Sequence, residues 1–288
     1  MTPNRQQNQQ SLRWQSQLIL LLFLPVAAAW ITLQAGQAWH FHGAVLWQAS
    51  WISLGFAVLV FALRAATAGA ALTGALIAAI LYLWIPGWRT ALWPLLALFL
   101  LTFAATRFGR RYKEKLGTAE GKRGRTASQV VANLGVAAMA AIPLSAARVF
   151  TPSAAVERSS LVVMVAALAE ATADTLSSEL GQVLGGEPRM LTTFGRVPAG
   201  TDGAVSVAGT AAGCAGAGLL VLVAALVLRL NVQESLVALG CGVFGLFADS
   251  LLGATMERRG WLNNDAVNTL STLAAALAAA FLSRMLTF

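Results

Sequence analysis

Long apolar runs separated by short polar segments dominate this chain of 288 residues. A helix needs about 20 apolar residues to cross the hydrocarbon core of a bilayer. Runs near that length predict nine membrane-spanning helices, at residues 17–34, 44–63, 66–85, 91–106, 127–149, 160–184, 203–228, 235–256 and 266–287. The fourth run is short and follows Pro86–Gly87, so a tilted or re-entrant segment is the alternative there. The pattern predicts an all-α fold, a polytopic membrane helical bundle.

The composition supports this interpretation and divides the chain into three parts. Hydrophobic residues make up 57% and charged residues 11%, against about 25% charged in soluble domains. Residues 1–16 are polar and Gln-rich, which predicts a disordered inner tail. Residues 17–106 contain no Asp or Glu and carry tryptophans near the helix ends, which is typical of scaffold helices anchored at the membrane interfaces. Residues 107–288 contain all the acidic residues and are predicted to form a catalytic bundle with inner-face loops.

Basic residues are distributed unevenly between the two sets of loops. With the N-terminus inside, 15 of the 20 Lys and Arg residues fall on the inner side, which agrees with the positive-inside rule. We therefore predict an N-in protein of a bacterial-type inner or plasma membrane, with its active site facing the cytoplasm. A net charge of +8 also occurs in nucleic-acid-binding proteins. The topology already explains this charge, so no nucleic acid partner is expected.

One apolar run contains three carboxylates. Glu170, Asp174 and Glu179 lie in the span 160–184, where an ionised side chain costs a few kcal/mol or more unless it faces water, a cation or a partner. Glu170 and Asp174 are four residues apart and share a helical face. Carboxylates one turn apart repel each other unless a cation lies between them, and Mg²⁺ is the usual cation where phosphates bind. The segment predicts a metal site, and the alternative is a polar stripe that hydrogen-bonds to a neighbouring helix.

A second acidic helix repeats part of the first. The segment Ala173–Leu176, with Asp174 and Thr175, is echoed by Ala248–Leu251, with Asp249 and Ser250. Both segments lie toward the inner end of a helix that runs from outside to inside. Such internal duplication occurs in membrane carriers, although a match this short also arises by chance. We expect Asp174, Asp249, Glu170 and Glu179 to be the metal ligands.

Polar and basic residues at the inner ends of the helices are the candidates for binding a polyphosphate. A basic cluster that contains glycines, at residues 121–125, directly precedes the fifth predicted helix. The helix dipole and the free backbone N–H groups at a helix N-terminus attract anions. A solvated basic loop is the alternative, and Thr201 or Asp202 also fits a helix N-cap. The residues expected to bind substrate or nucleotide are Arg123, Arg125, Ser128, Gln129, Asn133, Arg196, Thr201, Asp202, Gly203, Ser250, Arg258, Asn264, Asp265 and Asn268.

Five segments in order carry a likeness to a known family. They read ASQVVANLGVAA, ALAEATADTLSSELG, TTFGRVPAGTDGAVSVAGTAAG, FADSLLGATMERRG and NDAVNTLSTL. Together they resemble the integral-membrane domain-of-unknown-function family 92, over about residues 50–288 and most strongly from 128 to 273. That family includes plant phytyl-phosphate kinase, which converts a prenyl monophosphate to the diphosphate with CTP or a related nucleotide. A weaker likeness extends to dolichol kinase and phosphatidate cytidylyltransferase.

The resemblance implies an isoprenyl-phosphate kinase of the phytyl- or geranylgeranyl-phosphate type. A nucleoside triphosphate, CTP first among them, would donate its γ-phosphoryl group to a prenyl monophosphate held among the membrane lipids. Asp174, Asp249 and Lys122 are then the expected catalytic residues, and Mg²⁺ or Mn²⁺ is the expected cofactor. Two alternatives stay open. One is a cytidylyltransferase that makes a CDP-lipid, and the other is a transporter with a duplicated acidic site.

Overall fold

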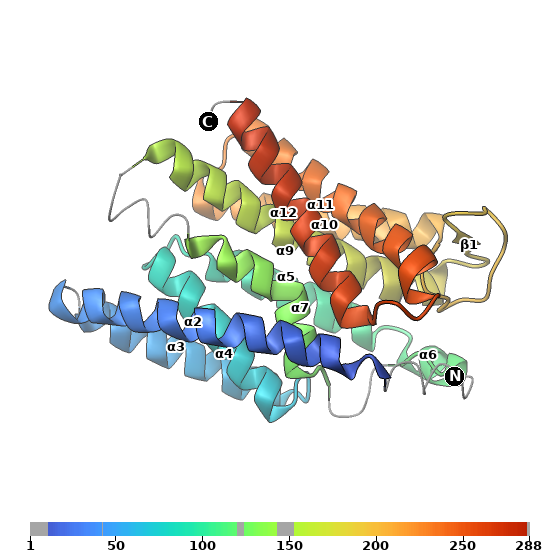
Figure 1. Ribbon diagram of the computed structural model, residues 1–288, viewed down its shortest axis with the longest axis horizontal. Coiled ribbons are helices and arrows are strands. Elements are labelled where there is room, and N and C mark those ends of the chain that lie inside the picture. The colour runs from blue at the N-terminus through green and yellow to red at the C-terminus, as the bar shows by residue number, and fades with distance from the viewer. Residues whose placement is uncertain (1–10, 42, 120–123, 143–152, 287–288) are drawn as a thin grey trace.

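The computed structural model describes residues 11–41, 43–119, 124–142 and 153–286. Its helices form two packed groups (Figure 1). The first group contains α2 (Arg13–Phe41), α3 (Gly43–Ala62) and α4 (Ala68–Trp84). The second contains α9 (Ala154–Leu184), α10 (Val207–Leu228), α11 (Val232–Leu252) and α12 (Asn264–Met285). Between them lie α5 (Leu92–Arg107) and α7 (Ala127–Met139), which contact helices of both groups.

The long helix α9 forms the centre of the second group. It packs against α5, α7, α10, α11 and α12, and every side chain from Val162 to Ala169 is fully buried apart from partly exposed Val163. Small residues let the neighbouring backbones approach closely, as is usual between membrane helices. A Cβ atom on Gly213 of α10 would lie 2.7 Å from the carbonyl oxygen of Ala173. Close backbone packing therefore holds the acidic segment of α9 against α10.

The helices confirm the predicted all-α membrane bundle. Within the described ranges, six helices are long and apolar enough to cross a bilayer: α2, α3, α9, α10, α12, and α11 with its continuation. Helix α5 and the short helix α6 (Arg110–Leu116) form a pair bent by 62° that makes a seventh if it is one span. Helices α4 and α7 are shorter, and the end of the predicted span 127–149 falls outside the described residues. The count of nine spans and the N-in orientation stay predictions.

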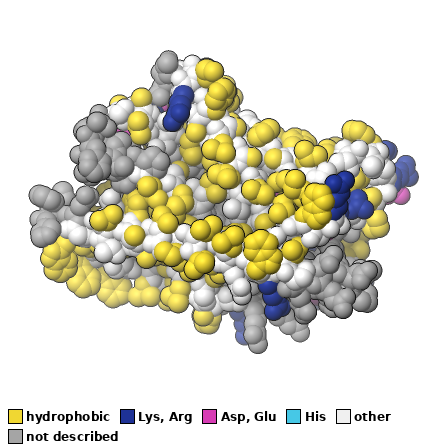
Figure 2. Space-filling model, viewed as in Figure 1, with side chains coloured by type: hydrophobic (Ala, Val, Ile, Leu, Met, Phe, Trp, Pro, Cys, Tyr) yellow, Lys and Arg dark blue, Asp and Glu magenta, His cyan; other side chains and the backbone are white. Residues whose placement is uncertain are grey.

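Exposed hydrophobic side chains cover the outer faces of these helices. Leu21 and Leu33 on α2, and Leu277 and Phe281 on α12, are more than half exposed. Figure 2 shows hydrophobic side chains spread over the face in view, with few charged ones among them. A soluble protein rarely exposes so much contiguous apolar surface. These faces are suited to contact with lipid chains.

The N-terminal segment differs from its prediction. Helix α2 begins at Arg13, so the last residues of the predicted disordered tail are helical. Gln15 donates from Nε2 to the carbonyl oxygen of Trp261 at 2.8 Å, and Ser16 donates from Oγ to Asp265 Oδ2 at 2.6 Å. These hydrogen bonds tie the start of α2 to the start of α12, which the polar composition of the segment did not reveal. Residues 1–10 of that tail lie outside the described residues.

Short irregular elements gather at one end of the bundle, near β1 and α6 in Figure 1. Strands β1 (Arg189–Met190) and β2 (Ala204–Val205) pair antiparallel between α9 and α10. Helix α11 continues into a π-helical turn, η1 (Gly253–Glu257). Such π-helical turns often occur at functional sites. This end of the molecule holds the polar site described next.

Candidate functional site

A polar cavity opens at this end of the bundle. It encloses about 1530 Å³, including its open mouth, between α7, α9, α11, α12 and the 198–206 loop. Twelve of the residues predicted from the sequence line it: Arg125, Gln129, Asn133, Asp174, Glu179, Thr201, Asp202, Gly203, Asp249, Ser250, Asn264 and Asn268. Five separate stretches of the chain contribute these side chains. The structure therefore brings most of the predicted residues to one place.

Two carboxylates from different helices meet in this cavity. Asp174 projects from α9 and Asp249 from α11, and their carboxyl groups lie within hydrogen-bonding reach of each other. Ser271 of α12 donates from Oγ to Asp249 Oδ1 at 3.3 Å. Glu257, at the end of the π-helical turn, also lines the cavity and is close enough to Asp249 for electrostatic repulsion. The two halves of the sequence repeat thus face each other across one acidic site.

Glu170 lies one turn before Asp174 on α9 and does not line the cavity. Its side chain is 1% exposed, and its Oε1 atom has no hydrogen-bond partner among the described residues. Helix α11 passes so close that a Cβ atom on Gly245 would lie 2.4 Å from Glu170 Cγ. A buried carboxylate oxygen without a partner is costly. Glu170 also lies within electrostatic range of Asp249.

The donor set suits a cation that is shared with phosphates. No three His, Cys, Asp or Glu side chains among the described residues converge on a common metal-binding point. Mg²⁺, however, usually takes only one or two protein carboxylates and completes its octahedron with water and phosphate oxygens. Asp174 and Asp249 supply two such oxygen donors at the cavity wall. The two aspartates therefore fit a Mg²⁺ ion that is also bound by a polyphosphate.

Glu179 has a different setting from the two aspartates. Lys113 of α6 donates from Nζ to Glu179 Oε2 at 2.5 Å, and the lysine side chain is 1% exposed. The carboxylate lines the cavity, but its charge is already balanced by this ion pair. Glu179 therefore differs from the other predicted metal ligands, because it forms an ion pair with a lysine from a distant part of the chain.

Arg125 is the cation that the structure places in the cavity wall. Its backbone is held between residues 65 and 67, because its N–H donates to Ala65 O and its carbonyl accepts from Thr67 N, both at 3.0 Å. Gly124, with φ +73°, allows this approach, since a Cβ there would lie 2.3 Å from the carbonyl carbon of Ala65. The guanidinium donates to Thr175 Oγ1 at 3.3 Å and lies within electrostatic range of Asp174. Scaffold helices thus position a basic residue beside the acids.

Several predicted residues do not line the cavity. Arg196 forms an exposed ion pair with Glu187, Arg258 donates to the sulfur of Met190, and Asp265 accepts from Ser16. Ser128 lies beside Thr126 at the N-terminus of α7, with their hydroxyl oxygens 3.1 Å apart. Arg196 and Arg258 contact residues of the segment 187–190, and Asp265 at the start of α12 contacts α2, which sequence position alone does not indicate. Lys122 and Arg123 lie outside the described residues.

Amide side chains connect the two sides of the cavity. Asn268 of α12 donates from Nδ2 to Asn133 Oδ1 of α7 at 2.8 Å. Gln129 accepts from the backbone N–H of Thr126 at 2.7 Å and so completes a capping box at the start of α7. Gln129 therefore stabilises the helix end as well as lining the cavity. The hydrogen bond between Asn268 and Asn133 links α12 to α7.

Sequence reasoning missed several polar residues of the cavity wall. The lining also includes Thr118, Thr175, Ser177, Ser178, Gln182, Ser206 and Glu257. Ser178 and Gln182 follow Asp174 at intervals of four residues on the same helical face, so helical spacing is a signal that could have found them. No local signal marked Thr118, whose Oγ1 donates to Gln182 Oε1 at 2.5 Å across 64 positions of sequence.

The loop before α10 packs tightly against the π-helical turn. Gly203 has φ +70°, and a Cβ atom there would lie 2.0 Å from the backbone nitrogen of Ala254. Only glycine fits this approach without a shift of the backbone. The loop residues Thr201 and Asp202 are therefore held against the end of α11, one turn beyond Asp249 and Ser250.

The fold and the cavity define an integral membrane protein with an acidic, polar site at one end of a helical bundle. The chain belongs to the family described as integral membrane protein DUF92, whose match covers residues 51–276. The resemblance inferred from the five sequence segments is therefore confirmed. A search of the solved structures finds no match.

Relatives occur in archaea, cyanobacteria and plants. An uncharacterised membrane protein of Methanocaldococcus jannaschii is 42% identical over 117 residues, which cover 41% of this chain and 49% of that protein. An uncharacterised membrane protein of Synechocystis is 35% identical over 201 residues, 67% of this chain and 73% of that protein. The chloroplastic protein VTE6 of Arabidopsis thaliana is 29% identical over 193 residues, 66% of this chain and 57% of VTE6.

Proposed function

We propose that this protein is a membrane kinase that transfers the γ-phosphoryl group of a nucleoside triphosphate to a prenyl monophosphate. One observation carries the proposal. Asp174 and Asp249 come from two helices with the same short motif and meet in a polar cavity beside Arg125. Carboxylates that hold Mg²⁺ and a cation that contacts phosphate oxygens are the parts that phosphoryl transfer requires.

The family supports the choice of acceptor. The sequence motifs that line the cavity are those that resemble plant phytyl-phosphate kinase, which acts on a prenyl monophosphate. A lipid acceptor also suits a site at the end of a membrane bundle, where a phosphate can lie in water while its chain stays in an apolar environment. We propose that the cavity faces the cytoplasm, where nucleotides are available.

The proposed reaction balances without a redox partner. An oxygen of the lipid monophosphate attacks the γ-phosphorus and forms a new P–O bond. The bond from the γ-phosphorus to the bridging oxygen of the β-phosphate breaks, and the nucleoside diphosphate leaves. The attacking phosphate oxygen is already ionised near neutral pH, so no strong general base is needed. The protein's task is to align the two phosphates and to offset their repulsion.

The residues of the cavity divide this task. Asp174 and Asp249 would hold Mg²⁺, with Glu170 one turn before Asp174 on α9. The ion would offset the repulsion between the charged phosphates. Arg125 would contact phosphate oxygens of the acceptor. The amides of Asn133 and Asn268, together with the 201–203 loop, would orient the nucleotide. Serine and threonine hydroxyls on α9 would donate to the remaining phosphate oxygens.

The proposal is tested by identifying products. Purified protein is incubated with Mg²⁺, geranylgeranyl or phytyl monophosphate, and CTP or ATP, and the lipid and nucleotide products are separated. We expect prenyl diphosphate and nucleoside diphosphate in equal amounts. Release of pyrophosphate with a CDP-lipid would instead assign a cytidylyltransferase. Absence of any product across the panel of nucleotides would contradict the kinase.

A further inference from the structure

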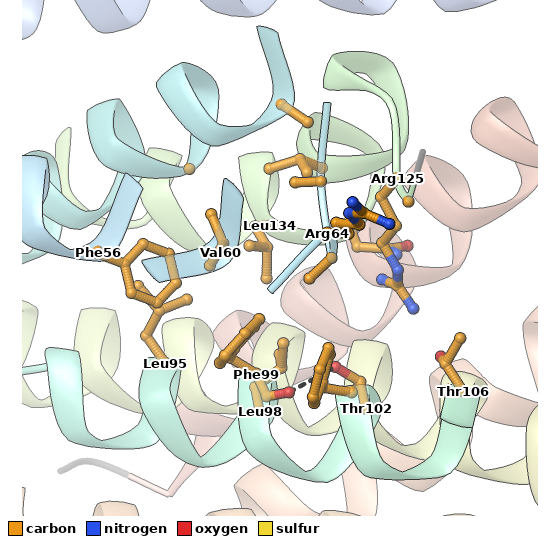
Figure 3. Close-up of a pocket in the computed structure, with 18 of the residues that line it drawn as sticks. Phe56, Val60, Arg64, Leu95, Leu98, Phe99, Thr102, Thr106, Arg125 and Leu134 are labelled. Carbon is orange, nitrogen blue, oxygen red and sulfur yellow. Dashed lines mark hydrogen bonds between the residues drawn. The ribbon is translucent and has the colours of Figure 1, made fainter. Parts of the chain in front are cut away.

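A second cavity adjoins the polar one (Figure 3). It encloses about 980 Å³, including its open part, between α3, α4, α5 and α7. Most of its lining is aromatic and aliphatic: Phe56, Val60, Leu95, Leu98, Phe99 and Leu134. Helices α3, α4 and α5 had no predicted role beyond that of a scaffold. Their inner faces instead enclose a space with the chemistry of a hydrocarbon site.

The two cavities meet at shared residues. Arg125 and Asn133 line both of them. Figure 3 shows Arg64 and Arg125 together at one end of the apolar cavity, and Phe56 and Leu95 toward the other. Four arginines line the apolar cavity: Arg64, Arg107, Arg110 and Arg125. The apolar interior thus adjoins the acidic site across residues that include a cation. This polarity matches a molecule with a long hydrocarbon chain and an anionic head.

We propose that the apolar cavity holds the hydrocarbon chain of the lipid monophosphate, with its phosphate directed past Arg64 and Arg125 toward Asp174 and Asp249. This inference rests on the proposed kinase function and deepens it, because it names where the acceptor lies. A neutral lipid has no charged group for the arginines of the cavity to contact. A free phosphate has no hydrocarbon chain to pack against the apolar walls.

The apolar walls would select the chain by its shape. A lipid that enters from the bilayer already lies in a hydrocarbon environment, so burial in the cavity provides little further hydrophobic free energy. Close packing against Phe56, Phe99 and Leu98 then decides which chains fit. A side chain that narrows the cavity should therefore act against long chains and leave short ones nearly unaffected.

Photolabelling tests the placement without relying on turnover. The purified full-length protein is incubated with a geranylgeranyl monophosphate analogue that carries a diazirine near the end of its chain, and labelled peptides are mapped after irradiation. We expect labels on residues 56–74 and 92–103, lost when unlabelled geranylgeranyl monophosphate is added in excess and retained with geranylgeraniol. Labels confined to helices other than α3, α4, α5 and α7, or equal competition by the alcohol, would overturn the placement.

A matched pair of substitutions on α4 sharpens the test. Ala70 lines the cavity and is 1% exposed, whereas Leu72 points outward and is 68% exposed. We expect Ala70→Phe to cut competed labelling at least fivefold and Leu72→Phe to leave it unchanged. Equal labelling of both folded variants would contradict the inference. If Ala70→Phe does not fold, the mapping in the unsubstituted protein decides alone.

The failure of this inference and that of the kinase function can be told apart. Competed labelling of α3–α5 without any diphosphate product would leave the lipid site standing and remove the kinase. Diphosphate formation with labels elsewhere would keep the kinase and remove this lipid site.

Discussion

Lys113 Nζ lies 2.5 Å from Glu179 Oε2 and ties helix α6 to helix α9. The same ammonium group donates to the carbonyl oxygens of Ala105 and Thr106, at 3.0 and 2.9 Å. These carbonyls belong to the last turn of α5, where no backbone N–H is available to them and where a cation is favourable. One buried lysine thus closes α5, fixes the bend into α6 and neutralises Glu179 at the cavity wall.

Loss of this lysine should reduce stability. Lys113→Met leaves Glu179 mostly buried without its partner and two carbonyls without a donor. Breaking a buried ion pair costs about 3 kcal/mol or more. We expect a clear fall in the thermal midpoint of the purified protein in detergent. Lys115→Met, at an exposed position of the same helix, should cost no more than about 0.5 kcal/mol. Similar losses in both variants would show that Lys113 has no special role.

Substitution of the paired aspartates should remove activity and leave the fold intact. In the product assay, Asp174→Asn and Asp249→Asn should each slow diphosphate formation by about 100-fold or more, as occurs when one preorganised charge is removed from an active site. Asp265→Asn is the control, because Asp265 contacts Ser16 of α2 and does not line the cavity. Its rate should fall less than tenfold. An active Asp249→Asn variant would rule out the proposed metal pair.

The contact between the 201–203 loop and the π-helical turn should be required for activity. Gly203→Ala places a methyl group against the backbone of Ala254 and also strains the positive φ of residue 203. Gly186→Ala introduces the strain alone, because Gly186 has φ +60° with no atom within 4 Å of the added Cβ. A left-handed alanine costs about 1–2 kcal/mol. We expect both variants to lose some stability, and only Gly203→Ala to lose at least tenfold in rate.

An ion pair at the other end of α9 should act on stability alone. Glu234 is fully buried, accepts from Arg158 and caps the start of α11 through the backbone N–H of Asn231 at 2.7 Å. Arg158 lies about 24 Å along the helix from Asp174, at 1.5 Å per residue. Glu234→Ala should therefore cost about 3 kcal/mol without changing the rate of the folded enzyme.

The exposed pair Arg196–Glu187 provides the comparison for that loss. Both of its side chains are 68% exposed, and such pairs contribute about 0–1 kcal/mol. Glu187→Ala should lower the thermal midpoint much less than Glu234→Ala. Chemical unfolding in mixed micelles measures both variants on the same scale. An equal effect would show that burial does not decide the strength of these two pairs.

Local patterns in the sequence determined the class of protein and the acidic pair. The length of the longer apolar runs is enough to predict membrane helices, because the bilayer thickness sets the number of residues needed. The echo of Asp174 by Asp249 predicted two carboxylates at matching depths on two helices. The five segments that resemble the family include both aspartates, and that resemblance implies phosphoryl transfer at these residues.

Partners that lie far apart in the chain were decided only by the tertiary structure. Glu179 forms an ion pair with Lys113 at the cavity wall, and Asp265 contacts Ser16 outside the cavity. A cavity lies between α3, α4, α5 and α7, and no run of apolar residues reveals whether the inner face of its helix is packed or open. Hydropathy and helical period are properties of neighbouring residues. Pairing and cavities depend on how whole helices cross, which those local properties leave undetermined.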